Sequence, residues 1–366
     1  MCRKNIVSKP SSIQVPKIIS SWDDLLAGID TLADWEARRT ILRQRYFDLI
    51  RDEEKPPKPS LDIQVEESVQ VEECYRRMLI SYQVEADERA HAYLGIPCHL
   101  ERSAPAVVAL HGTTAQGGRQ TAGLEGPSDK AYLDHLCRQG FVVIAPEHFV
   151  SGHRQPDAGA YETAAFYEKH PRWTAVGKFT YEHSLAVDVL LTHGEVDSDR
   201  IGVMGHSLGG QGAYYLAAYD ERIKAAVCNC GAEFFRHNPT VENFARDHWY
   251  VYYPHLRPQL LEGRMPAIDI HEIIALIAPR AYLDILGLND GNPLVQDQRV
   301  LMLLKIARLY DLCGVPENFG FYCHGQRHSV RPESRALLLK FFENHLRTDR
   351  NTPGFQAASQ PPRVEP

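Results

Sequence analysis

The sequence predicts an α/β fold in which a mostly parallel central sheet carries helices on both faces. After Pro105, short apolar runs alternate with helical patterns, and strands that are buried on both faces and separated by helices form parallel sheets. The chain has 366 residues, of which 44% are hydrophobic and 24% are charged. This composition is typical of globular proteins and supplies a large apolar core, so we expect folding to need no metal or disulfide.

The first sixty residues predict a helical cap or arm that precedes the sheet. The charged, proline-broken stretch DEEKPPKPS then ends the helix and forms a linker. From residue 63 to residue 100 apolar and polar residues alternate, which predicts antiparallel strands. The helix itself is predicted over residues 31–50 from apolar side chains at helical spacing, namely Leu32, Trp35, Ile41, Leu42, Tyr46, Leu49 and Ile50.

The main α/β domain is expected to span residues 61–348. Two long insertions, residues 147–173 and 232–265, are expected to form a lid above the sheet. Residues 349–366 are rich in proline and polar side chains, which predicts a flexible tail. The buried strands of the domain are predicted at the runs PAVVAL (105–110), FVVIAP (141–146), IGVMG (201–205), IKAAVCNC (223–230), AYLDILG (281–287) and NFGFYCH (318–324).

Charge and cysteine content exclude several classes of protein. The formal charge of −7 argues against a nucleic-acid surface, which needs a basic face. No apolar run approaches the roughly eighteen residues that cross a bilayer, and the N-terminus lacks the apolar stretch of a secretory signal. The eight cysteines have no CxxC or zinc spacing, which favours reduced thiols and a cytoplasmic location. We expect no cofactor and no metal, and a homo-oligomer stays open.

The strongest local signal is the sequence GHSLG at residues 205–209, which joins an apolar run to a helical pattern. A serine in such a turn has a strained backbone, so the positions two residues away on either side must be small. The pattern predicts Ser207 as a nucleophile and the amide of Leu208 as a donor to an oxyanion. The alternative is a tightly packed strand-to-helix turn without chemistry.

A serine hydroxyl needs a base, and the base needs an acid that holds its tautomer. In sheets with this kind of turn, the acid and then the histidine follow the serine along the chain. Asp290 follows the apolar run 281–287, and His328 lies between the last run and the last helical pattern. His324 is the alternative base, and Glu233 is the alternative acid.

The substrate is expected to lie above the carboxyl ends of the strands, under the lid. The turn HGTT at residues 111–114 supplies the second oxyanion donor, which we assign to the amide of Thr113. Aromatic side chains of the lid suit an aryl, acyl or sugar group, or they form a small core of the lid itself. The candidate substrate-binding residues are His206, Phe234, Phe235 and Trp249.

These residues together resemble the α/β-hydrolase superfamily over residues 61–346. Within it the chain is most similar to the dienelactone-hydrolase-like and acetyl-xylan-esterase-like carboxylesterases. Dienelactone hydrolases proper use a cysteine nucleophile, so Ser207 departs from them. The phrases that carry the resemblance are VD at 196–197, DRIG at 199–202, DERI at 220–223 and APR at 278–280.

The resemblance and the residues together predict a metal-free serine carboxylesterase that acts on a small-molecule ester through an acyl-enzyme. Ser207 is the expected nucleophile, His328 the base and Asp290 the acid. A serine peptidase or an acyltransferase could use the same residues. A binding protein that retains the fold without catalysis is a further alternative, since fold does not determine function.

Overall fold

The structure is a computed structural model that describes residues 21–236, 238, 241–291 and 293–347. The predicted tail at residues 349–366 and the first twenty residues of the predicted N-terminal arm lie outside the described residues. Within the described part of the chain, no helix is long and apolar enough to span a bilayer.

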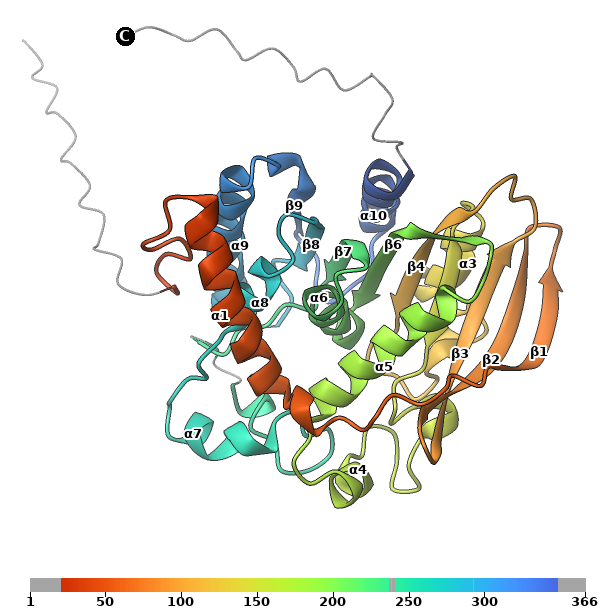
Figure 1. Ribbon diagram of the computed structural model, residues 1–366, viewed down its shortest axis with the longest axis horizontal. Helices are drawn as coiled ribbons and strands as arrows, with labels where there is room; N and C mark the ends of the chain where they lie inside the picture. The colour runs from red at the N-terminus through yellow and green to blue at the C-terminus, as the bar shows by residue number, and fades with distance from the viewer. Residues whose placement is uncertain (1–20, 237, 239–240, 292, 348–366) are drawn as a thin grey trace, which may run out of the picture.

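The centre of the molecule is a nine-stranded sheet with the strand order β1-β2-β3-β5-β4-β6-β7-β8-β9 (Figure 1). Strands β1, β2 and β3 are antiparallel to their neighbours, whereas β5, β4, β6, β7, β8 and β9 run parallel. Both predictions for the sheet are therefore confirmed. The bounds of the strands are β1 Gln64–Val71, β2 Tyr75–Glu85, β3 Glu88–Pro97, β4 Ala104–Leu110, β5 Val142–Pro146, β6 Val196–His206, β7 Ile223–Asn229, β8 Ala281–Gly287 and β9 Phe319–His324.

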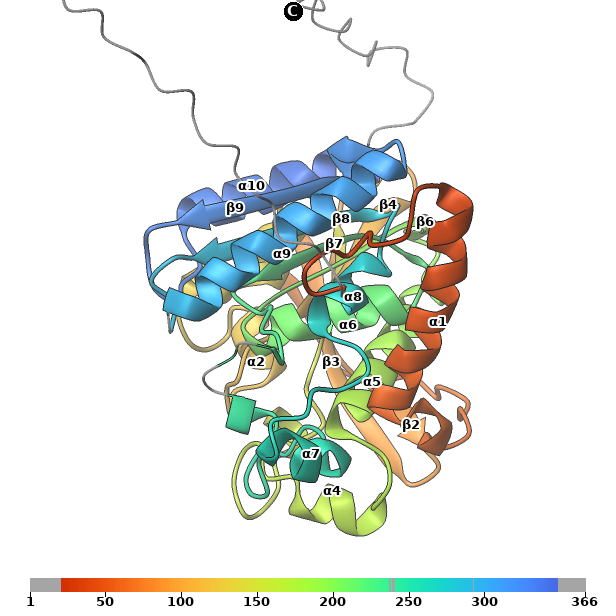
Figure 2. The same cartoon turned by 90° about the vertical axis from the view of Figure 1, so that its left-hand side faces the viewer.

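Helices cover both faces of the sheet, as predicted. One hydrophobic core packs helices α1, α5, α6, α8 and α9 against one face, and a second core packs α3 and α10 against the other. Figure 2 shows α1, α5, α6 and α9 from the side of the first core. The helices are α1 Leu32–Ile50, α2 Gly118–Thr121, α3 Tyr132–Cys137, α4 Ala164–Lys169, α5 Ala175–Leu190, α6 Leu208–Tyr219, α7 Arg257–Leu261, α8 Ile270–Ala275, α9 Pro293–Leu312 and α10 Pro332–Phe342, which continues into a π-helical turn, Glu343–Arg347.

Helix α1 begins and packs as its sequence suggests. Thr31 caps it by accepting a hydrogen bond from the Asp34 amide, and the Asp34 carboxylate returns to the Thr31 amide. The Tyr46 hydroxyl donates to the Tyr215 carbonyl at 2.8 Å and fixes α1 on α6. Leu32 and Ile41 lie outside this contact and are half-exposed, so the buried stripe is narrower than the apolar pattern.

The two insertions pack against each other above the carboxyl ends of the parallel strands. We call the described residues of 147–173 and 232–265 the roof. Thr163 Oγ1 donates to the Trp249 carbonyl at 2.6 Å, and Trp249 Nε1 donates to the Ala160 carbonyl at 3.1 Å. The Tyr250 hydroxyl lies 2.6 Å from His148 Nε2. Because these bonds join the two segments, the roof is one unit over the edge of the sheet that holds the predicted site.

Candidate active site

Ser207 lies in a strained turn between β6 and α6. Its backbone angles are φ 60° and ψ −123°, a conformation that costs free energy and is concentrated at functional sites. A Cβ on Gly205 would lie 2.2 Å from the Gly209 carbonyl, and a Cβ on Gly209 would lie 2.2 Å from the Leu110 carbonyl oxygen. Both glycines are therefore required by close backbone approach, as the sequence pattern predicted.

The turn at residues 111–114 lies directly beside Ser207. A Cβ on Gly112 would be 3.4 Å from the Ser207 Cβ. The hydroxyl of Tyr161, from the roof, accepts from the Thr114 amide at 3.0 Å and lies 3.1 Å from the Gly112 carbonyl oxygen, to which it can donate. The sequence analysis did not find Tyr161, because nothing in its surroundings marks which of the roof tyrosines turns back to the sheet.

Two backbone amides beside Ser207 have no partner within the described chain. Neither the Leu208 amide, at the start of α6, nor the Thr113 amide donates a hydrogen bond to another described residue. The Leu208 amide also stands at the positive end of the α6 dipole. These amides are therefore available to a ligand with a developing negative charge.

Asp290 and His328 form a hydrogen-bonded pair at the same edge of the sheet. Asp290 follows β8, His328 follows β9, and His328 Nδ1 lies 2.8 Å from Asp290 Oδ2. The two loops are joined by the Leu288 amide, which donates to the His324 carbonyl at 2.8 Å, and by Asn289 Nδ2, which donates to the Gly325 carbonyl at 2.7 Å. With Nδ1 held by the carboxylate, Nε2 is the nitrogen of His328 that can serve another group.

The surroundings of Asp290 favour its charged form. Partial burial of the carboxyl opposes ionisation, but the hydrogen bond and the charge of His328, with a further hydrogen bond from Cys230, hold the pKa of Asp290 below its ordinary value. Cys230 has a φ of 52° directly after β7. The sequence analysis did not assign a role to Cys230, although its position at the end of a parallel strand was a signal.

The His328 ring contacts the ring of His206, the residue before Ser207. The centroids of the His328 and His206 rings are 4.4 Å apart, and His206 immediately precedes Ser207. Within the described chain no hydrogen bond joins the Ser207 hydroxyl to His328. Burial, and next the charge of His328, lower the pKa of His206 to about 3, so His206 is neutral beside the pair.

The alternative residues take other positions. His324 is buried at the end of β9, where its Nδ1 accepts a hydrogen bond from the Gln326 amide at 3.3 Å. Glu233 Oε1 accepts from Asn238 Nδ2 at 3.1 Å. The carboxylate that hydrogen-bonds His328 is that of Asp290.

The predicted substrate-binding residues differ in exposure. His206 is buried behind Ser207, and Phe234 and Phe235 are only 2% and 1% exposed. Phe234 packs edge-on against Trp22, and Phe235 packs against Phe244. Trp249 is 38% exposed, and the Arg246 guanidinium lies 5.0 Å above its ring. Phe234 and Phe235 therefore belong to the packed interior of the protein, whereas the Trp249 side chain is partly exposed.

Two groups of side chains in the described chain have donor atoms close enough to hold a metal ion. One group, Cys230, Asp290 and His328, includes the histidine–carboxylate pair described above. The other consists of His91, Glu147 and His153.

The fold is that of an α/β-hydrolase, and comparison with known proteins agrees. Residues 91–246 match the sequence model of the dienelactone hydrolase family. This match covers less than half of the chain and agrees with the resemblance drawn from its sequence. The chain is a hydrolase with the α/β-hydrolase fold, and over residues 91–246 it is similar to the dienelactone hydrolase family.

The chain is also similar to individual proteins of known sequence. It is 29% identical over 255 residues to the putative hydrolase YtaP of Bacillus subtilis, a match that covers 68% of this chain and 80% of that protein. It is 31% identical over 198 residues to the carbohydrate esterase MZ0003 of an unknown prokaryotic organism, covering 48% of this chain and 45% of that protein.

Solved structures share the fold at low sequence identity. A glucuronoyl esterase from Solibacter usitatus has a TM-score of 0.64 at 17% identity, over 87% of this chain and 94% of that one. A putative acetyl xylan esterase from Bacteroides fragilis has a TM-score of 0.63 at 18% identity, over 86% of this chain and 84% of that one.

Proposed function

We propose that the protein is a serine carboxylic-ester hydrolase in which Ser207, His328 and Asp290 form the catalytic triad. The observation that carries the proposal is the 2.8 Å hydrogen bond between His328 and Asp290 at the edge of the sheet where Ser207 stands in its strained turn. A serine, a tautomer-fixing carboxylate and a histidine with a free Nε2 are the parts that acyl transfer requires.

The reaction proceeds in two steps. His328 Nε2 takes the proton of the Ser207 hydroxyl while Oγ attacks the ester carbonyl, and the same proton then passes to the departing alcohol. The acyl group stays on Ser207 until a water, deprotonated by His328 Nε2, attacks it. The same proton then passes from His328 to Ser207 Oγ as the carboxylic acid leaves. Asp290 stays ionised throughout and stabilises the imidazolium that forms twice in the cycle.

The oxyanion of each tetrahedral intermediate is proposed to lie between the amides of Leu208 and Thr113. Each such donor contributes about 3 kcal/mol to transition-state stabilisation. The unpartnered state of both amides in the described chain supports this assignment, as does the closeness of the turn at residues 111–114 to Ser207.

We infer that His328 closes on Ser207 when substrate binds. Its side chain is 43% exposed and is held by Asp290 at one nitrogen, and hydrogen bonds of catalytic groups often tighten only when substrate is bound. The neutral His206 places no second positive ring beside His328 and therefore does not oppose its protonation.

The proposed substrates are esters of sugars or aryl groups. The exposed ring of Trp249 in the roof can stack on a sugar or aryl ring, and a relative of this chain is named a carbohydrate esterase. His206 contributes by shaping the floor beside Ser207, and Phe234 and Phe235 support the roof from within.

Burst kinetics with an activated aryl ester, followed by a panel of acetylated sugars, uronic-acid esters, lactones and peptides, tests the proposal. We expect about one equivalent of alcohol per chain in the burst, none with Ser207→Ala, and preference for esters over peptides. Hydrolysis that survives Ser207→Ala unchanged would contradict it.

A serine peptidase is the second candidate function, because one match points to it. The chain is 31% identical over 118 residues to dipeptidyl-peptidase 5 of Porphyromonas gingivalis, although this segment is 16% of that protein. Peptide cleavage faster than ester cleavage in the same panel would favour the peptidase.

We also propose a cytoplasmic location. The cysteines of the described residues are free thiols, which suits a reducing compartment. Fractionation of the native host, with recovery of the activity outside the cytoplasm, would contradict this assignment.

A further inference from the structure

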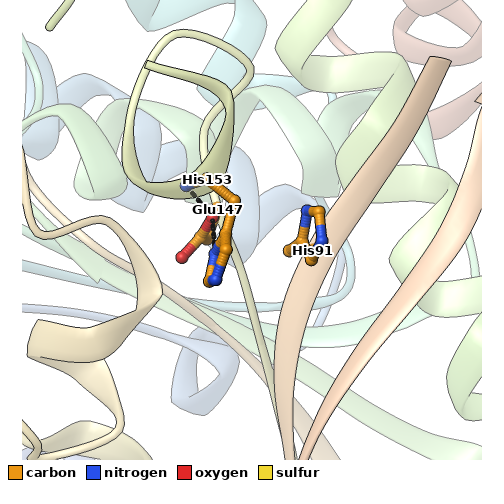
Figure 3. Close-up of side chains that lie close together, drawn as sticks. All are labelled: His91, Glu147 and His153. Atoms are coloured by element: carbon orange, nitrogen blue, oxygen red, sulfur yellow. Dashed lines mark hydrogen bonds and ion pairs between the residues drawn. The ribbon is translucent and has the colours of Figure 1, made fainter. Parts of the chain in front are cut away.

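A second cluster of titratable side chains lies at the same edge of the sheet, between β3 and the roof. Its members are His91 on β3, Glu147 directly after β5, and His153 in the short turn Gly152–Arg154. Figure 3 shows the two histidine rings and the carboxylate gathered at one place. One donor atom from each of the three residues lies within 4.8 Å of the other two.

The backbone brings His91 and Glu147 together, and the Glu147 side chain holds His153. The Glu147 amide donates to the His91 carbonyl at 2.9 Å, which extends the pairing of β3 with β5. The His153 amide donates to Glu147 Oε2 at 2.8 Å, and His153 Nδ1 lies 3.0 Å from the same oxygen. The rings of His91 and His153 stack with centroids 4.3 Å apart.

The cluster leaves buried polar atoms without partners. The Glu147 side chain is fully buried, and within the described chain its Oε1 accepts no hydrogen bond. The Nδ1 of His91 is also buried and unpartnered. Because burying a polar atom without a partner costs free energy and is rare in proteins, each of these atoms points to a missing ligand.

Glu66 completes the arrangement from β1. Its Oε1 lies 3.3 Å from His91 Nε2. A carboxylate on one nitrogen of a histidine fixes the ring and directs the other nitrogen to a metal. Because Glu66 contacts Nε2 of His91, the nitrogen that remains for an ion is the unpartnered Nδ1.

We propose that His91, Glu147 and His153 bind a divalent transition-metal ion of the zinc class. Two imidazoles and one carboxylate are a donor set that zinc uses with a fourth position left to water, whereas Ca²⁺ and Mg²⁺ prefer oxygen donors throughout. The sequence analysis expected no metal, because these ligands have no recognisable spacing along the chain.

One donor pair already has the separation that such an ion requires, and the third ligand must move closer when the ion binds. Two donor atoms that are each about 2.1 Å from one ion lie about 3.0–3.4 Å apart, as His153 Nδ1 and Glu147 Oε2 already do. A separation at the upper bound of 4.8 Å must close by about 1.4 Å. The stacked rings of His91 and His153 must also turn so that one nitrogen of each ring faces the ion. His153, whose side chain is 36% exposed, lines a surface groove of about 370 Å³ together with Gln116 and Arg119, and the ion enters from that groove.

The bound ion would brace the roof and the turn beside Ser207. The Gly152 amide donates to the Ala115 carbonyl at 3.2 Å, and the His148 amide donates to His111 Nε2 at 3.0 Å. An ion that joins His91 to Glu147 and His153 would therefore hold β3, the roof and the turn at residues 111–114 in one arrangement. This role is structural and is independent of the proposed esterase reaction.

The experiment uses the full chain without an affinity tag, stripped with a chelator and dialysed against Zn²⁺ or Co²⁺. We expect one ion per chain, visible Co²⁺ absorption typical of nitrogen and oxygen ligands, and no displacement by Ca²⁺ or Mg²⁺. His153→Ala and Glu147→Gln should each weaken Zn²⁺ binding by at least about tenfold.

Two control variants locate the ion. His99→Ala changes an exposed histidine outside the cluster, and Cys230→Ser removes a donor of the other candidate group; both should bind Zn²⁺ as the parent does. His153→Ala should retain the far-ultraviolet circular dichroism of the parent, because His153 is partly exposed in a short turn. No bound ion in the parent, or binding that Cys230→Ser abolishes and His153→Ala leaves intact, would overturn the proposal.

Discussion

Two histidine–carboxylate pairs stand at the carboxyl edge of the same sheet, and they differ in their neighbours. His328 Nδ1 lies 2.8 Å from the Asp290 carboxylate, and His153 Nδ1 lies 3.0 Å from the Glu147 carboxylate. The histidines are similarly exposed, at 43% and 36%, whereas the carboxylates are 17% and 0% exposed.

This difference shows that a histidine–carboxylate pair does not by itself determine whether the site transfers protons or binds a cation. The His328 ring lies 4.4 Å from the ring of His206, the residue before a strained serine with unpartnered amides around it in the described chain, which suits proton transfer. His153 stacks on a second histidine beside a buried carboxylate oxygen without a partner, which suits a cation. The predictions below test this division between the two pairs.

The largest expected effect belongs to Ser207→Ala. Because Ser207 is the proposed nucleophile, kcat for an activated ester should fall by at least about 10⁴-fold, while Zn²⁺ binding stays unchanged. Steady-state kinetics and equilibrium dialysis measure the two quantities. The matched control is Ser198→Ala, which changes an exposed serine near the amino end of β6, at the opposite edge of the sheet from Ser207. A loss below tenfold would remove Ser207 from the role.

Substitution of the two carboxylates, Asp290 and Glu147, should have very different effects on kcat. Asp290→Asn lets the wrong tautomer of His328 form, so kcat should fall by about 10⁴-fold; Glu147→Gln should change kcat by less than about tenfold. Glu233→Gln tests the alternative acid in the same assay. A larger loss for Glu233→Gln than for Asp290→Asn would reverse the assignment of the acid.

Added Zn²⁺ should stabilise the folded chain through the second pair alone. At a free ion concentration one hundred times the Kd, the free energy of unfolding should rise by about 2.7 kcal/mol. Thermal or urea unfolding of the parent, His153→Ala and His328→Ala measures it. Equal stabilisation of the parent and His153→Ala would mean that the ion lies elsewhere.

The smallest expected effect concerns acid stability. The pKa of Asp290 is lowered in the folded protein, so its ionised form adds stability that is present above the unfolded value of about 3.9 and lost as pH falls through the folded value. Parent and Asp290→Asn should thus differ more in urea unfolding at pH 6 than at pH 3. A difference that grows on acidification would contradict the described environment of Asp290.

The elements with strong local patterns could be predicted from the sequence. Gly205 and Gly209 predict the turn that holds Ser207, because only glycine tolerates the close backbone contacts at these two positions. Asp290 and His328 followed from the order of residues after parallel strands, and the structure brings them within hydrogen-bond distance.

The other features of the sites depend on tertiary contacts, which the spacing of residues along the sequence does not predict. His91 lies on β3, an antiparallel strand between β2 and β5, and His153 lies in a roof turn, so their meeting depends on the pairing of β3 with β5. Aromatic content suggested a substrate surface at Phe234 and Phe235, but composition does not tell which ring faces inward, and the structure buries both.

Covalent labelling tests the central claim most directly. A fluorophosphonate reacts with a serine only where a base activates it and an oxyanion site receives the phosphoryl oxygen. Intact mass and peptide mapping of the folded parent should find a single adduct on Ser207, formed far more slowly in Asp290→Asn and absent from Ser207→Ala. A folded parent that acquires no adduct, or acquires it at another residue, would contradict the account.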